Sequence, residues 1–222
     1  MNNGRITLIA LLLAFGNGAA SAQNFYFGGS LGQSNTKFDG SDYSFEDPAL
    51  SGLISERRDK TDNAWKLFAG YEFNKYIAVE GGHAELGSPE VRYSGSGPLQ
   101  GLKGKARLKQ SAWFISAKGT LPIHERFNLF GKVGITHNKS SISAKSNDAV
   151  LNAYLDLPHK KSADKTGLFY GVGAEYVLDK NIRFRLEYEN FGRFGSRGYV
   201  LEDRETGRSK TDLWSLGVTL NF

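Results

Sequence analysis

The stretch that decides the fold is "LWSLGVTLNF", which runs from Leu213 to Phe222. An alternation of apolar with small or polar residues is typical of a β-strand with one hidden face, whereas a helix repeats about every 3.6 residues. The question is whether the apolar face meets a protein core or lipid. The residues of this face are Trp214, Leu216, Val218, Leu220 and Phe222.

The first 22 residues predict a secretory signal peptide rather than a part of the fold. They contain Arg5, an apolar run from Ile6 to about Phe15, and the small triplet at residues 20–22. This run is too short to span a bilayer, and a buried N-terminal helix is the alternative interpretation. The expected organisation is residues 1–22 as signal peptide and residues 23–222 as one folded domain.

The composition favours β structure and excludes several kinds of site. The chain has 27 glycines, 13% aromatic residues and no cysteine, so a disulfide scaffold and a thiolate metal site are ruled out. After the signal, no apolar run reaches the length of about 18 residues that a membrane helix needs. The "GLKGKA" stretch lacks the residues of a phosphate loop, and we expect no cofactor. Metal-ligand spacing is absent from the four histidines, His83, His124, His137 and His159.

Eight segments alternate with period two, and the connections between them alternate between long and short. A soluble sandwich has no reason to sort its connections by length in this way, whereas a membrane barrel has tight turns at one end and long loops at the other. We therefore expect an all-β fold, an eight-stranded antiparallel up-and-down transmembrane β-barrel with four long extracellular loops and three short periplasmic turns. The expected strands are Phe25 to Gln33, Ala64 to Phe73, Tyr76 to Leu86, Arg107 to Leu121, Phe127 to Thr136, Gly167 to Leu178, Ile182 to Asn190, and Asp212 to Phe222.

The two faces of these segments indicate which one meets lipid. One parity is apolar and rich in aromatic residues, and it often places an aromatic residue near a turn, as an interfacial girdle would. A soluble barrel would point its charges outward, but here we expect them to point into the barrel. The opposite parity carries Lys66, Glu72, Glu80, Lys118, Lys132, Glu175, Arg183, Arg185, Glu187 and Glu189.

An eight-stranded barrel has room inside only for side chains, and unpaired buried ions are costly. The sequence therefore predicts an interior ion-pair network. Its role is either to plug the barrel or to form a gated conduction path. We assign to it the charges near the middle of the strands: Glu80, Lys118, Lys132, Glu175, Arg185 and Glu187.

Four stretches closely resemble the eight-stranded transmembrane domain of OmpA-type outer-membrane proteins. They are "FAGYEFNKYIAVEGGHAELG", "SAKGTLPI", "GVGAEYVLDKNIRFRLEYENF" and the terminal "LGVTLNF". The resemblance implies that Glu80, Lys118, Glu175 and Arg185 form the interior cluster proposed as a gate in that family. His83 stands where the family commonly has Tyr. The chain stops at its last strand, so the periplasmic peptidoglycan-binding domain of full-length relatives is not expected.

The resemblance implies a multi-pass protein of the bacterial outer membrane. The terminal Phe222 and the apolar residues before it resemble the signal read by the outer-membrane assembly machinery, which with periplasmic chaperones is an expected partner. Three of the four long connections are basic. This charge either only keeps the loops soluble or contacts the phosphates of lipopolysaccharide or a host surface, as in adhesion. The loops lack a regular groove of aromatic and basic residues, so we expect no nucleic acid.

We therefore expect a structural and surface-interaction protein that is not an enzyme. The alternative is a narrow or gated, porin-like pore through the interior network. Another alternative is a lipid-modifying enzyme that uses His137 and Ser140 of the "HNKSS" stretch as a dyad. This alternative is less favoured, because one His with a nearby Ser is common in loops.

Overall fold

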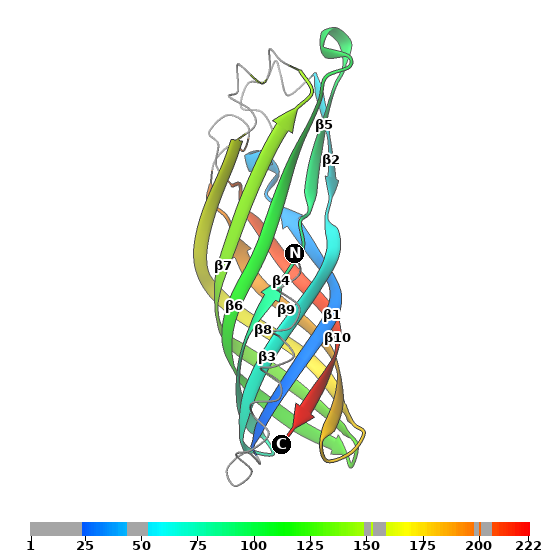
Figure 1. The fold of residues 1–222 in the computed structure, drawn as a ribbon, viewed down its shortest axis with the longest axis vertical. Helices are drawn as coiled ribbons and strands as arrows, with labels where there is room; N and C mark the ends of the chain where they lie inside the picture. The colour runs from blue at the N-terminus through cyan, green and yellow to red at the C-terminus, as the bar shows by residue number, and fades with distance from the viewer. Residues whose placement is uncertain (1–23, 44–52, 149–151, 153–158, 198–199, 201–205) are drawn as a thin grey trace, which may run out of the picture.

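The protein folds into one antiparallel β-barrel in the computed structural model (Figure 1). The structure describes residues 24–43, 53–148, 152, 159–197, 200 and 206–222, so the expected signal peptide lies outside the described residues. The elements in this part of the chain are β1 (Phe25–Phe38), η1 (Gly40–Tyr43), β2 (Ile54–Asp59), β3 (Thr61–Asn74), β4 (Ile77–Glu85), β5 (Glu90–Gly95), η2 (Gly97–Leu99), β6 (Lys103–His124), β7 (Phe127–Ser146), β8 (His159–Val177), β9 (Ile182–Phe194) and β10 (Ser209–Asn221).

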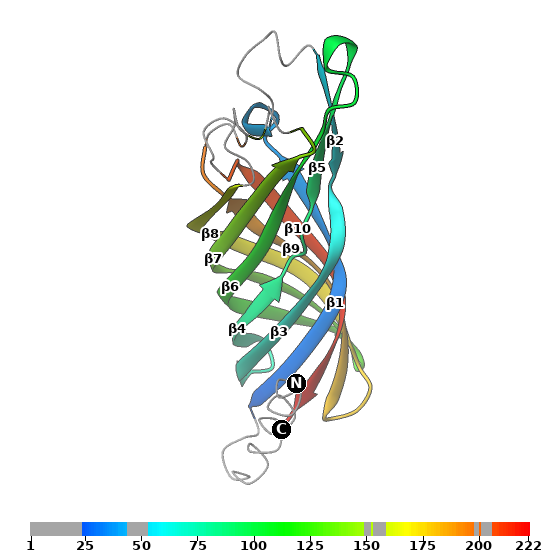
Figure 2. The ribbon, with the colours of Figure 1, turned by 45° about the horizontal axis from the view of Figure 1, so that its top comes forward.

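Eight of these strands close the ring, which confirms the expected eight-stranded barrel. They follow the order β1–β3–β4–β6–β7–β8–β9–β10, and β10 returns to β1 with Tyr26 opposite Asn221. The strands β2 and β5 pair with each other, and β5 pairs with β6, so that they continue the sheet beyond the ring at one end (Figure 2). Within the described residues, no helix is long and apolar enough to span a membrane.

Short turns join the strands at the end of the barrel opposite to β2 and β5. Asn74 closes the turn between β3 and β4, because its side-chain oxygen accepts hydrogen bonds from the backbone N–H groups of Tyr76 (2.8 Å) and Ile77 (3.0 Å). Asp179 accepts equivalent bonds from Asn181 (2.8 Å) and Ile182 (2.9 Å) before β9. Asn and Asp favour such turns because their short side chains replace a backbone acceptor.

The alternation in the sequence becomes an inside and an outside in the barrel. In β10, Trp214 and Leu216 are 57% and 67% exposed, whereas Ser215 is buried in the interior. The other large apolar side chains on the outer face follow the same rule, so the apolar partner of the last strand lies outside the barrel and not in a protein core.

Several strands run farther than the sequence predicts. The expected second long connection, residues 88–105, contains β5 and the start of β6, and the expected third one, from His137 to Lys165, contains the ends of β7 and β8. The reason is visible in β7, where Ile142 and Ala144 point inward and Lys145 points outward. Beyond the apolar band, the apolar residues are thus on the inner face and the polar residues on the outer face. This is the reverse of the pattern in the membrane-spanning part, so these segments were not predicted as strands.

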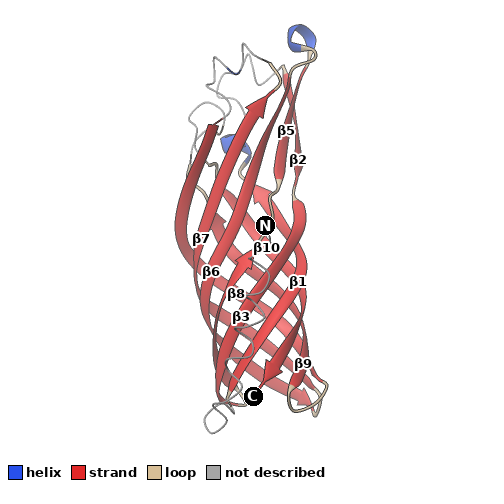
Figure 3. Cartoon of the chain, viewed as in Figure 1, coloured by secondary structure: helices blue, strands red, loops and turns tan. Residues whose placement is uncertain are grey.

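These strand extensions enclose a hydrophobic cluster at the loop end of the barrel. Tyr43 of η1 is 1% exposed and donates a hydrogen bond to the carbonyl oxygen of Thr206 (3.1 Å). Tyr93 of β5 donates to the carbonyl oxygen of Tyr43 (3.0 Å). Figure 3 shows η1 beside the end of the ring and η2 at the tip of the β5–β6 hairpin. The remaining members are Ile54, Val91, Ala106, Leu108, Ile142, Ala144 and Val200.

Candidate functional site

The middle of the barrel is filled by charged side chains that pair with one another. Four bases and four acids take part, and the side chain of each is at most 1% exposed. They come from six strands, β3, β4, β6, β7, β8 and β9, and their parity on each strand directs them inward. The bases are Lys66, Lys118, Lys132 and Arg185, and the acids are Glu80, Glu175, Glu187 and Glu189.

Arg185 joins the strands on opposite sides of this cluster. Its Nη1 lies 2.8 Å from Glu80 Oε2, and its Nε donates to Glu175 Oε1 at 2.7 Å. Glu175 also accepts a hydrogen bond of 2.5 Å from Lys118 Nζ. The hydroxyl group of Tyr26 donates to Glu80 at 2.9 Å. A single guanidinium group therefore links β4, β8 and β9.

Lys132 is the second centre of the cluster. Its Nζ lies 2.7 Å from Glu80, 2.6 Å from Glu187 and 3.2 Å from Glu189. Lys66 contacts Glu187 and lies 2.5 Å from Glu189. With all eight groups ionised the formal charges cancel, and every charge has an oppositely charged neighbour. Burial is tolerated under these conditions, because an uncompensated buried ion costs several kcal/mol.

The structure brings together all six residues that the sequence assigned to the interior network. It adds Lys66 and Glu189, which the alternation placed on the inward parity but which lie outside the mid-strand set chosen from the sequence. Their register shows why they belong: Lys66 is opposite Ala84 of β4, and Glu189 is opposite Gly171 of β8. Small neighbours leave space for the long side chains to reach the centre. Inward parity was the signal in the sequence, because the small residues opposite Lys66 and Glu189 are known only from the strand register.

Aromatic rings surround the charges. The Arg185 guanidinium lies 4.8 Å from the Phe68 ring and 5.3 Å from the Phe130 ring, distances at which a cation is attracted to the ring face. Glycines make room for these rings, since a Cβ atom at Gly28 or Gly173 would collide with Phe68 or Phe130. The Gly-rich "GVGAEY" stretch therefore serves packing.

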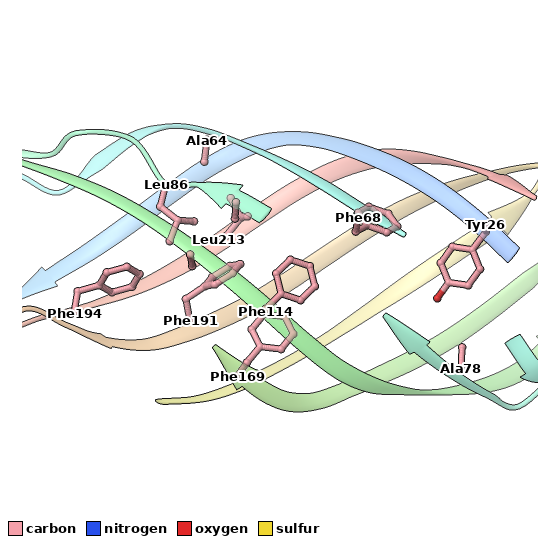
Figure 4. Packing of buried hydrophobic residues seen from close by; sticks show 12 residues of the cluster. Tyr26, Ala64, Phe68, Ala78, Leu86, Phe114, Phe169, Phe191, Phe194 and Leu213 are labelled. Carbon is pink, nitrogen blue, oxygen red and sulfur yellow. The ribbon is translucent and has the colours of Figure 1, made fainter. Parts of the chain in front are cut away.

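A layer of phenylalanines lies next to the charged cluster along the barrel. The Phe114 and Phe169 rings stack at 4.9 Å, and Phe169 lies 5.1 Å from Phe191 (Figure 4). Tyr26 and Phe68 are farther along the barrel in the same view. Together with the cluster around Tyr43, the interior contains a charged layer, an aromatic layer and an apolar closure at the loop end.

The outer face carries an aromatic belt where the apolar band ends. The His83 ring lies between two indoles, 5.9 Å from Trp65 and 4.6 Å from Trp113. Farther around the barrel, Tyr188 pairs with Trp214 at 4.9 Å. His83 thus takes part in the belt at the position where a Tyr was expected. Amphipathic rings in such a belt are typical of the boundary between lipid and water.

Comparison with known proteins settles the family. The family model of the outer membrane protein beta-barrel domain matches residues 7–222. The chain belongs to this family. It is 27% identical over 227 residues to outer membrane protein A of Serratia marcescens, covering 97% of this chain and 56% of that protein. It is 28% identical to outer membrane protein P5 of Haemophilus influenzae, with coverage of 97% and 60%.

The outer membrane barrel family also accounts for the location and the fold. The chain lies in the bacterial outer membrane, as the resemblance implied, and it spans just over half the length of the curated relatives that it matches. Among solved structures, the outer membrane protein OprG from Pseudomonas aeruginosa superimposes with a TM-score of 0.53 at 18% identity. This match covers 90% of the present chain and 96% of OprG, and it shows the shared fold.

His137 and Ser140 do not form a dyad in this barrel. Both are on β7, but His137 is exposed on the outer face and Ser140 is buried on the inner face. The Nδ1 atom of His137 lies 3.4 Å from the hydroxyl group of Thr166, and Ser140 donates to the carbonyl oxygen of Ala163 (3.2 Å). Residues three apart on a strand have opposite parity, so the pairing that the less favoured enzyme alternative requires fails for a geometric reason. In the described part of the chain, no group of three acidic or histidine side chains could hold a metal ion.

Beyond the belt, the outer face of β5 and β6 is basic and is organised around one carboxylate. Glu90 accepts hydrogen bonds from Arg92 Nε (2.8 Å) and Arg107 Nη2 (3.0 Å), and Lys105 Nζ lies 3.8 Å away. Burial alone would raise the pKa of Glu90, but the two guanidinium groups and Lys105 outweigh this effect and hold the pKa below its ordinary value. Three cations thus share one acid, and positive charge remains in excess.

Proposed function

We propose that this protein is a structural outer membrane barrel with a sealed interior, which contributes to membrane integrity and presents a basic surface outside the cell. The observation that supports a structural role is the filling of the interior. The charged cluster, the phenylalanine layer and the cluster around Tyr43 follow one another along the barrel and leave no described side chain of the network in contact with solvent. Interiors of eight-stranded barrels are generally filled in this way.

Planar-bilayer recordings test the sealed interior. We expect no steady conductance from the wild-type protein, because ions would have to displace paired charges that are at most 1% exposed. The variant Lys118→Met, with Lys109→Met as the control on the outer face, tests the alternative of a gated pore. Wild-type openings whose size changes in Lys118→Met but not in Lys109→Met would replace the structural proposal by the pore.

Lys139 and Lys109 lie on the outer face just beyond the belt formed by Trp113 and its neighbours, where lipopolysaccharide phosphates gather. We propose that these cations contact lipopolysaccharide, and that the basic face beyond them is available to a host surface. Removal of both charges in Lys109→Gln/Lys139→Gln should weaken the binding of purified lipopolysaccharide to the detergent-solubilised protein. Unchanged binding would contradict this assignment.

We propose that residues 1–22 are a signal peptide, that residues 23–222 form the barrel domain, and that periplasmic chaperones and the outer-membrane assembly machinery handle the chain. The outward residues of β10 from Trp214 to Leu220, together with Phe222 after the strand, would be the assembly signal. We also propose that the protein is not an enzyme, in keeping with the separation of His137 from Ser140 by the barrel wall.

A further inference from the structure

The outer face of β5, β6, β7 and β8 continues beyond the aromatic belt, and strand pairing arranges its side chains in rows. Trp113 is opposite His83 and His137 in the belt row. Eight residues farther along β6, Lys105 is opposite Arg92 of β5 and Lys145 of β7. We name these three residues, Arg92, Lys105 and Lys145, the cation row.

The cation row is electrostatically unfavourable by itself. Directly opposite side chains on neighbouring strands have Cβ atoms about 5 Å apart, and like charges in such pairs destabilise a sheet. The next row toward the belt adds Arg107 and, on β8, Lys160, with Ser143 between them. Five cations of β5 to β8 therefore occupy two adjacent rows on one face, and Arg57 of β2, which is opposite Arg92, continues the first row.

Acidic residues compensate this charge only in part. Glu90 serves Arg92, Lys105 and Arg107, and Asp59 lies 3.7 Å from Arg92. Within the described part of the chain, no carboxylate forms an ion pair with Lys145 or Lys160. The side of the face formed by β7 and β8 is therefore the less neutralised side, and an external anion would relieve the repulsion along the row.

The distance from the belt separates this face from the phosphates of the lipid headgroups. Eight residues of a strand extend about 26 Å, which becomes about 20 Å along the membrane normal for a strand tilted by about 40°. The interfacial layer of a bilayer is only about 5 to 8 Å thick on each side. The cation row therefore lies beyond the lipid headgroups.

We propose that this face is a binding site for an extracellular linear polysaccharide that carries sulfate groups. A chain with repeated anions can lie across β5, β6 and β7 and meet one cation on each strand, about 5 Å from the next. The outward residues of the two rows include no aromatic ring in the described residues, so the site recognises charge rather than stacked bases or sugar rings. This inference rests on the proposed surface role and names the ligand class and the residues.

The barrel offers a matched control on its other side. Lys210 of β10 is opposite Lys37 of β1 and Arg193 of β9, so this second row also contains two lysines and one arginine in register. Here Asp212 neutralises Lys37 at 3.1 Å. The triple variants Arg92→Gln/Lys105→Gln/Lys145→Gln and Lys37→Gln/Arg193→Gln/Lys210→Gln lose the same net charge from different faces.

The test measures the binding of dextran sulfate to purified protein in a zwitterionic detergent, with neutral dextran as the blank. We expect the cation-row variant to bind roughly 10- to 100-fold more weakly than wild type, and the control triple variant to change much less. Glu90→Gln should bind more tightly, because it removes the acid at the centre of the site. Heat-modifiable gel mobility confirms that each variant is folded.

Two outcomes would overturn the inference. If both triple variants lost the same affinity for dextran sulfate, binding would depend only on the net charge of the protein. Binding of lipopolysaccharide with a phosphorylated core, without any binding of dextran sulfate, would assign the cations to the membrane's own glycolipid. In the second case the proposed surface role would stand while the sulfated ligand would not, so the two proposals fail separately.

Discussion

Replacement of Lys66 by methionine is the sharpest perturbation of the interior cluster. Lys66→Met keeps the length of the side chain and removes its charge, which leaves three bases facing four acids. Loss of one partner from a buried ion pair costs about 3 to 5 kcal/mol. We expect the lower end, about 3 kcal/mol, because Lys132 still lies 2.6 Å from Glu187 and 3.2 Å from Glu189.

The compensating change is Glu189→Gln. The double variant restores charge balance and retains the six residues that were assigned to the network from sequence alone. We expect it to be more stable than the sum of the single changes predicts, with a coupling energy of about 1 to 3 kcal/mol. A double variant that is more stable than this sum would show that Lys66 and Glu189 act as a pair and that the other six charges can balance without them.

The assay is urea unfolding of the protein in phosphatidylcholine vesicles, followed by tryptophan emission. All three tryptophans, Trp65, Trp113 and Trp214, are exposed on the outer face, so their emission reports the loss of lipid contact. Lys109→Met is the matched control, since Lys109 is 66% exposed and 3.9 Å from Glu85, and such surface pairs contribute about 0 to 1 kcal/mol.

Two results would refute the reasoning. If Lys66→Met cost no more than Lys109→Met, water would have to reach the interior and screen the charges. If the double variant were as unstable as the two single changes added together, Lys66 and Glu189 would not be coupled.

Three further predictions address other parts of the molecule. Phe222→Ser should slow the appearance of the heat-modifiable folded form in cells but leave refolding into detergent unchanged; equal slowing in both would contradict an assembly signal. The pKa of Glu90 lies below the ordinary value of a glutamate, so its contribution to the stability of β5 should be complete above that ordinary value and lost as the pH falls through the lower folded pKa. Amide hydrogen exchange of β5 should show this loss in wild type and not in Glu90→Gln, and a pH-independent wild type would refute it. Lipid A examined by mass spectrometry should be the same in cells that carry wild type, His137→Ala or Ser140→Ala, and any difference would restore the enzyme interpretation.

Sequence reasoning located the interior charges because alternation along a strand is strictly local. Glu80 and Arg185 are inward simply because their apolar neighbours are outward, and no knowledge of the partner strand is needed. Lys66 was on the same parity but was not assigned to the network, since its membership depends on which strands close the ring and on the small residues opposite it. The pairing of His137 with Ser140 failed for the same local reason, because their separation of three residues places them on opposite faces.

By itself, the sequence determined the barrel, the inward charges and the apolar outer band. Each follows from a period of two, which the backbone imposes on every strand, and the alternation around Trp214 is enough to show it. Only the tertiary structure decided how far the strands continue. Beyond the belt, water replaces lipid on the outer face and the apolar residues point inward, so that the segment with Ile142 and Ala144 no longer resembles a membrane strand. Strand register, which depends on contacts between distant segments, then places Arg92, Lys105 and Lys145 in one row. The cations of this row repel one another, and an anion that binds them would relieve the repulsion. No single stretch of the chain contains this site.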